Sequence, residues 1–124
     1  MTDFDELLPD VMAGRRPDGR PAYYDRQGQP MTMRQWAGRF HDVEYKRVRL
    51  TYLDDGTEIS TAWLGLDHQF GAGPPLIFET MVFLPGPDAD GRRTAADECE
   101  RYSTEAEAIA GHEAIVEKWS RPRD

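Results

Sequence analysis

The chain has 124 residues and a net charge of −8, with 23 acidic against 15 basic side chains. This length supports one hydrophobic core but not two, so we expect a single domain over residues 1–124. The acidic balance argues against direct nucleic-acid binding, which needs clustered Lys and Arg to neutralise phosphates. No apolar run approaches the roughly 18 residues of a membrane span, and the N-terminus is acidic where a signal peptide would be basic. We therefore predict a cytoplasmic protein without membrane association.

Chemical motifs are scarce in this sequence. Cys99 is the only cysteine, which excludes an intramolecular disulfide and a cysteine-rich zinc site, and only Arg101 stands near it to activate a thiolate. Residues 71–73 read Gly-Ala-Gly, but two prolines follow where a phosphate loop needs the free amides of a helix N-terminus. No Walker, Gly-x-Ser-x-Gly or kinase-like motif occurs. The sequence predicts neither a cofactor nor a dedicated metal site.

The N-terminal part of the chain is predicted to be a loop-rich segment followed by a helix. Residues 1–31 are rich in Pro, Gly and Asp and are predicted as a loop-rich N-terminal segment. Thr32 and Gln35 then have the form of a capping box. Apolar residues recur after it at helical spacing: Met33, Trp36, Ala37 and Phe40. This pattern predicts a helix over residues 33–40.

Strand-like segments follow. Residues 45–53 alternate between apolar and polar side chains, residues 54–57 form a turn with Gly56 free to adopt positive φ, and residues 58–66 return as a second strand. A third strand over residues 76–84 is apolar on both faces. Such a strand is either covered on both sides or part of an oligomer interface, so a homodimer through this strand is one option.

The C-terminal part reads as a polar segment and a helix. Residues 85–100 are predicted as a mobile polar loop. Thr104 and Glu107 form a second capping-box pattern, and Ile109, His112, Val116 and Trp119 lie on one stripe. We expect this helix to pack on the sheet. The predicted fold class is α+β, an antiparallel sheet of three or four strands with the C-terminal helix on one face and a short N-terminal helix.

Charge is unevenly distributed along the chain. Residues 15–49 contain nine basic and four acidic side chains, whereas residues 97–117 contain seven acids against the single base Arg101. The two regions either complement each other within the fold or present an acidic face to a basic partner.

Polar residues occur at several positions where a core would be apolar. His68 and Asp67 lie at the end of the second predicted strand, Glu79 lies inside the third, and His112 lies in the helix stripe. If the helix packed on the sheet face that carries Glu79, Glu79 and His112 would approach each other, with Asp67 and His68 nearby. Two imidazoles and a carboxylate suffice for a divalent metal or for acid–base work.

The same four residues also have structural interpretations. A buried Glu79 and His112 would satisfy each other or the backbone, and Asp67 would cap a turn in the glycine-rich loop. No His-x-x-x-His or His-x-x-x-Glu pair supports a metal site. We therefore treat Asp67, His68, Glu79 and His112 as a candidate binding cluster and assign no catalytic or metal-ligating residue.

Four stretches resemble a family of small bacteriophage and prophage proteins to which no reaction is assigned. The stretches are YYDRQGQP at residues 23–30, LGLDH at 64–68, FETMVF at 78–83 and RYSTEAEAIAGHE at 101–113. The resemblance implies expression in an infected or lysogenic bacterial cell and an accessory role. It implies no substrate.

Two functions follow as expectations. The first is a noncatalytic accessory protein that binds a protein of the host or the phage through the third strand or the acidic last helix. The alternative is a small metal-dependent or acid–base enzyme, hydrolase-like, built on His68, Glu79 and His112.

Overall fold

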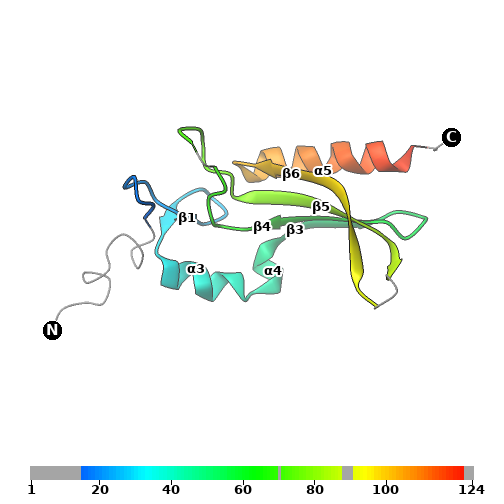
Figure 1. Ribbon diagram of the computed structural model, residues 1–124, viewed down its shortest axis with the longest axis horizontal. Coiled ribbons are helices and arrows are strands. Elements are labelled where there is room, and N and C mark those ends of the chain that lie inside the picture. The colour runs from blue at the N-terminus through cyan, green and yellow to red at the C-terminus, as the bar shows by residue number, and fades with distance from the viewer. Residues whose placement is uncertain (1–14, 70, 88–90, 122–124) are drawn as a thin grey trace.

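The computed structural model describes residues 15–69, 71–87 and 91–121. The first 14 residues of the predicted loop-rich segment therefore lie outside the described part. The main sheet has four strands, and Figure 1 shows helix α5 (Glu105–Ser120) above it. Helices α3 (Met33–Phe40) and α4 (Val43–Lys46) lie below it, toward the end near β1 (Tyr23–Tyr24). The α+β prediction is confirmed, with the C-terminal helix packed on one face of an antiparallel sheet.

Short elements precede the sheet. Strand β1 (Tyr23–Tyr24) pairs antiparallel with β2 (Pro30–Met31), and helices α3 (Met33–Phe40) and α4 (Val43–Lys46) follow. The bounds of α3 agree with the prediction. Its capping box forms in both directions, because the Gln35 backbone N–H donates to Thr32 Oγ1 at 3.1 Å and the Thr32 N–H donates to Gln35 Oε1 at 2.9 Å.

Trp36 attaches α3 to the end of the sheet. Its ring centroid lies 4.9 Å from that of Tyr23 and 4.8 Å from that of Phe40, and its Nε1 donates to the Leu64 carbonyl at 2.8 Å. Gly65, at φ +75°, lies directly beside this ring, and a Cβ there would collide with it. Gly65, the glycine of the LGLDH stretch, therefore leaves the space in which Trp36 of α3 packs against the end of the sheet.

The sheet follows chain order. Strands β3 (Arg47–Tyr52), β4 (Glu58–Trp63), β5 (Phe78–Pro87) and β6 (Arg93–Tyr102) are each antiparallel to the next. The predicted hairpin is confirmed, with Gly56 at φ +92° in its turn. Residues 45 and 46 belong to α4 rather than to a strand, because Asp42 caps that helix by accepting from the Tyr45 N–H at 3.2 Å.

The prediction of a polar loop over residues 85–100 is wrong. In the described part of this range, β5 continues to Pro87 and β6 begins at Arg93. Strand β6 is an edge strand whose pairing with β5 compensates for its low hydrophobicity. In the middle of β6, Ala96 packs against the core and Glu98 pairs with Lys118 of α5, while Asp97 between them is exposed.

Helix α5 (Glu105–Ser120) contacts all four strands. Thr104 caps it, accepting from the Glu107 N–H at 3.1 Å. The helix buries Ala108, His112 and Ile115 against one sheet face. That face presents buried residues of the two central strands: Ile59, Thr61 and Trp63 from β4, and Phe78, Thr80 and Val82 from β5.

Gly111 sets how closely α5 approaches β6. The Tyr102 ring lies against this glycine, and a Cβ at position 111 would collide with it. Tyr102 of the RYST stretch thus contacts Gly111 of the AGHE stretch where α5 packs on β6. Across the described ranges, no helix combines the length and apolar character needed to cross a membrane.

Candidate functional site

A buried chain of polar side chains runs beneath α5. His112 is 1% exposed, and its two ring nitrogens lie 2.7 Å from Thr61 Oγ1 and 2.8 Å from Thr51 Oγ1. Thr61 Oγ1 in turn lies 2.5 Å from Thr80 Oγ1. Three adjacent strands therefore supply the hydroxyl groups around one imidazole, with both of its nitrogens satisfied.

Burial lowers the pKa of His112 below its ordinary value of 6.5, and the Arg49 cation lowers it further, while Glu113 acts in the opposite direction. The imidazole is thus held neutral, with one nitrogen donating and the other accepting. His112 is thus a satisfied, buried group, but its partners are the hydroxyl groups of Thr51 and Thr61, and the expectation that it bonds Glu79 or the backbone is wrong.

The lowered pKa predicts a pH-dependent stability. The unfolded chain takes up a proton at His112 at higher pH than the folded chain does, so stability is complete above about pH 6.5 and is lost as pH falls from there toward the folded pKa. We expect the melting temperature to fall between about pH 7.5 and 5, and to fall less in His112→Gln. The exposed His41 provides the control, because His41→Gln should retain the wild-type pH dependence. Equal pH profiles for wild type and His112→Gln would count against this assignment.

Glu79 lies on the opposite face of the sheet from His112. Its Oε2 accepts from Arg101 Nε at 3.0 Å and from the Cys99 thiol at 3.4 Å. The expected approach of Glu79 to His112 is wrong, because α5 packs on the alternate side chains of β5, beginning with Phe78.

Asp67 is buried and organises the loop after β4. Its side chain is 0% exposed, and Oδ1 accepts from the backbone N–H groups of Gln69 at 2.7 Å and Leu76 at 3.0 Å. Oδ2 accepts from Arg16 Nη1 at 3.1 Å. The prediction that Asp67 caps a turn in the glycine-rich loop agrees with these bonds.

His68 takes no part in a shared site. Its Nδ1 lies 2.8 Å from the Leu66 carbonyl, within the same loop. Arg20 holds the far end of that loop by donating to the carbonyls of Gly71 at 2.7 Å and Gly73 at 2.9 Å. The four candidate residues are thus divided among a buried helix face, an open sheet face and a loop. Among the residues that the structure describes, no group of three His, Cys, Asp or Glu side chains is placed to hold a metal ion.

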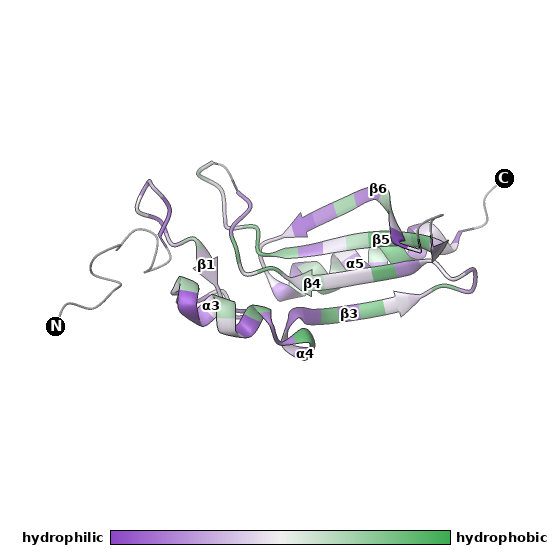
Figure 2. Cartoon of the chain, turned by 60° about the horizontal axis from the view of Figure 1, so that its bottom comes forward, coloured by the Kyte–Doolittle hydropathy of each residue, from purple (hydrophilic) through white to green (hydrophobic). Residues whose placement is uncertain are grey.

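Beyond the end where α4 contacts β3 and β4, the described residues place no helix over the sheet face opposite α5. Figure 2 shows β3 to β6 from this side, with α5 behind the sheet. Three cross-strand rows make up this surface, which we call the open face. The rows are Arg47, Ala62, Glu79 and Arg101; then Leu50, Ser60, Met81 and Cys99; and then Tyr52, Glu58, Phe83 and Ala95.

The middle of the open face is apolar and its edges carry ion pairs. Met81 and Phe83 are half-buried, and Tyr52 is 64% exposed. The guanidinium of Arg93 stacks on the Phe83 ring, 3.7 Å from its centroid, and pairs with Glu58. At this end, the β5–β6 hairpin and the β3–β4 turn enclose a hollow of about 300 Å³ lined by Tyr52, Phe83 and Leu84, among others.

Cys99 lies on the open face, across from Met81. It is exposed at the surface, yet partial burial and the neighbouring Glu79 carboxylate raise its pKa. A raised pKa keeps the thiol protonated and opposes nucleophilic reactivity.

Sequence reasoning found only part of this surface. The apolar second face of residues 76–84 includes Met81 and Phe83, but the sequence predicts no strand that contains Cys99 and Arg101. In the structure Thr94, Ala96 and Glu98 are half-buried and alternate with exposed residues, but the sequence of β6 shows no matching alternation of apolar and polar side chains that could identify the strand.

Comparison with known proteins adds no functional assignment. No protein-family model matches the chain, and neither a curated protein nor a solved structure shows significant similarity to it.

Proposed function

We propose that this chain is a noncatalytic binding protein that recognises a protein partner through the open face. One observation carries the proposal: α5 covers only one side of the sheet, and the other side presents half-buried Met81 and Phe83 without a covering helix among the described residues. The resemblance to phage and prophage proteins adds the cellular context, an accessory role in the cytoplasm of an infected or lysogenic bacterium.

The composition of the open face suits protein recognition. Protein interfaces combine an apolar centre with a polar rim and are enriched in aromatic residues, Met and Arg. Here Met81 and Phe83 form the centre, while the Glu79–Arg101 pair lies toward one end. The alternative enzyme has lost its supporting geometry, because His68 and Glu79 lie on surfaces separate from His112.

A variant pair tests this proposal. Met81→Lys places a charge at the centre of the open face, whereas Ala114→Lys makes the same charge change at an exposed position of α5. We expect Met81→Lys to weaken partner capture from host lysate roughly tenfold or more, and Ala114→Lys to leave capture unchanged. Equal capture by both variants, with unchanged circular dichroism, would reject the open face as the contact surface.

The homodimer predicted for residues 76–84 is a special case of the same proposal. Two copies meeting through their open faces would place Met81 of each chain in the interface. Native mass at increasing concentration then detects a dimer in the wild type, and Met81→Lys should convert it to monomer. A monomeric wild type would mean that the partner is a different protein and not a second copy of this chain.

A further inference from the structure

A second surface of the chain carries basic side chains that form no ion pair among the described residues. Arg34, Arg39, Lys46 and Arg47 form no ion pair with any described residue. All four lie on α3, on α4 or at the start of β3. In a chain whose acids outnumber its bases by 23 to 15, cations that find no carboxylate are unexpected.

The basic side chains elsewhere show the contrast. Arg49 pairs with Glu113, Lys118 pairs with Glu98, and the same arrangement recurs at other positions: Arg16, Arg26, Arg93, Arg101 and Arg121. Arg15 and Arg20 also form no ion pair with a described residue, and Arg20 instead donates to the carbonyls of Gly71 and Gly73. The α3–α4 surface is distinguished by four such cations on consecutive elements of the fold.

Aromatic rings hold two of the unpaired cations. The Arg39 guanidinium carbon lies 4.8 Å from the centroid of the Tyr45 ring, and Lys46 Nζ lies 4.1 Å from that of Phe40. A cation over an aromatic face is attracted to it and remains free to bond an anion from its other side. These contacts restrict the side chains in advance and so reduce the entropy cost of binding.

A hollow of about 620 Å³ lies at the same surface, between α3 and the β1–β2 connection. Arg34 and Arg39 line it together with Met31 and Tyr45. Asp25 also lines it, but Asp25 Oδ1 already accepts from the backbone N–H groups of Gln27 and Gln29, each at 2.9 Å. The hollow thus combines two available cations with apolar and aromatic walls.

We infer that this hollow binds an acidic segment of a protein partner, with carboxylates on Arg34 and Arg39 and an apolar side chain against Met31 and Tyr45. Charge complementarity identifies the occupant. A nucleic acid fits less well, because its phosphates need an extended basic stripe and the net charge of −8 repels a long polyanion. This inference is independent of the open face.

The experiment uses a fluorescein-labelled peptide of alternating Glu and Leu. A labelled oligothymidylate of equal charge represents the alternative ligand, a nucleic acid. Fluorescence anisotropy of the full-length chain should show binding of the acidic peptide that weakens as salt is added. The double variant Arg34→Glu/Arg39→Glu should bind it roughly tenfold more weakly or worse.

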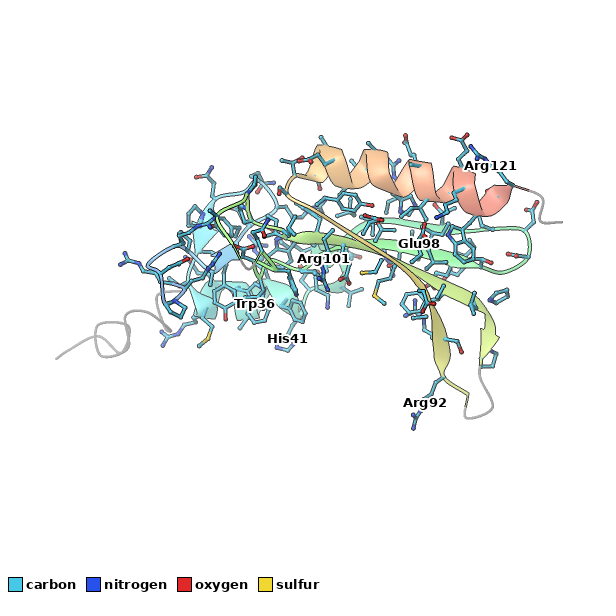
Figure 3. The ribbon with its side chains drawn as sticks, turned by 45° about the horizontal axis from the view of Figure 1, so that its top comes forward. Trp36, His41, Arg92, Glu98, Arg101 and Arg121 are labelled. Carbon is cyan, nitrogen blue, oxygen red and sulfur yellow. The ribbon has the colours of Figure 1, made fainter. Side chains whose placement is uncertain are left out.

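The matched control is Arg92→Glu/Arg121→Glu. Arg92 at the tip of the β5–β6 hairpin and Arg121 at the end of α5 lie far from Trp36 of α3 (Figure 3). This control should keep wild-type affinity for the peptide. The inference is overturned if both double variants bind the peptide equally, or if the oligothymidylate binds the wild type as tightly as the peptide does.

Discussion

Asp67→Ala is expected to lower the free energy of unfolding by about 2–4 kcal/mol. The carboxylate is fully buried, and its removal leaves two backbone N–H groups and the Arg16 guanidinium without their acceptor. Chemical denaturation monitored by tryptophan fluorescence measures the change.

The neighbouring residue is the control for this prediction. His68→Ala should change stability by less than about 0.5 kcal/mol, because within the described ranges the His68 side chain bonds only to the nearby Leu66 carbonyl. If the two alanine variants proved equally stable, Asp67 would not be the organiser of the loop.

His112→Ala is expected to lower the free energy of unfolding by about 2–4 kcal/mol. The substitution opens a cavity under α5 and removes the partner of the Thr51 and Thr61 hydroxyl groups. Thermal and chemical denaturation at about pH 7.5, where the imidazole is neutral in both states, isolate this packing effect from the pH effect.

Glu79→Ala serves as the comparison. The Glu79 side chain is 15% exposed and that of its partner Arg101 is 41% exposed, and an ion pair that is open to solvent on one side contributes about 0–1 kcal/mol. A loss at Glu79 as large as that at His112 would mean that the open face contributes to the core, contrary to its role as a contact surface.

The elements with strong local signals were predictable. Thr32 and Thr104 mark helix starts by side chains that bond their own backbone, so three or four residues of sequence contain the relevant information. The hairpin around Gly56 is local in the same way. Strand β6 is not predicted because it is held by pairing with β5 and contains three acids, residue types with low strand propensity.

The candidate site was mispredicted for a related reason. Strand alternation placed Glu79 and Phe78 on opposite faces correctly, but no local pattern states which face the helix covers. The pairing of Thr61 with Thr80 across β4 and β5 decides it, since their hydroxyl groups accommodate His112. Threonine is common in strands because of its β propensity, so its presence there does not indicate that it bonds a histidine.

The most direct test of the open face uses Cys99, the only cysteine of the chain and a member of that surface. A maleimide photocrosslinker is attached to Cys99, at about pH 8.5 because the raised pKa keeps the thiol protonated. The same crosslinker is attached to Cys99→Ser/Glu117→Cys, which carries it on the exposed side of α5.

Both labelled proteins are irradiated in host lysate. The binding proposal predicts one specific crosslinked partner, or a crosslinked dimer, from position 99 and none from position 117. The same product from both positions, or a product from position 117 alone, would contradict it.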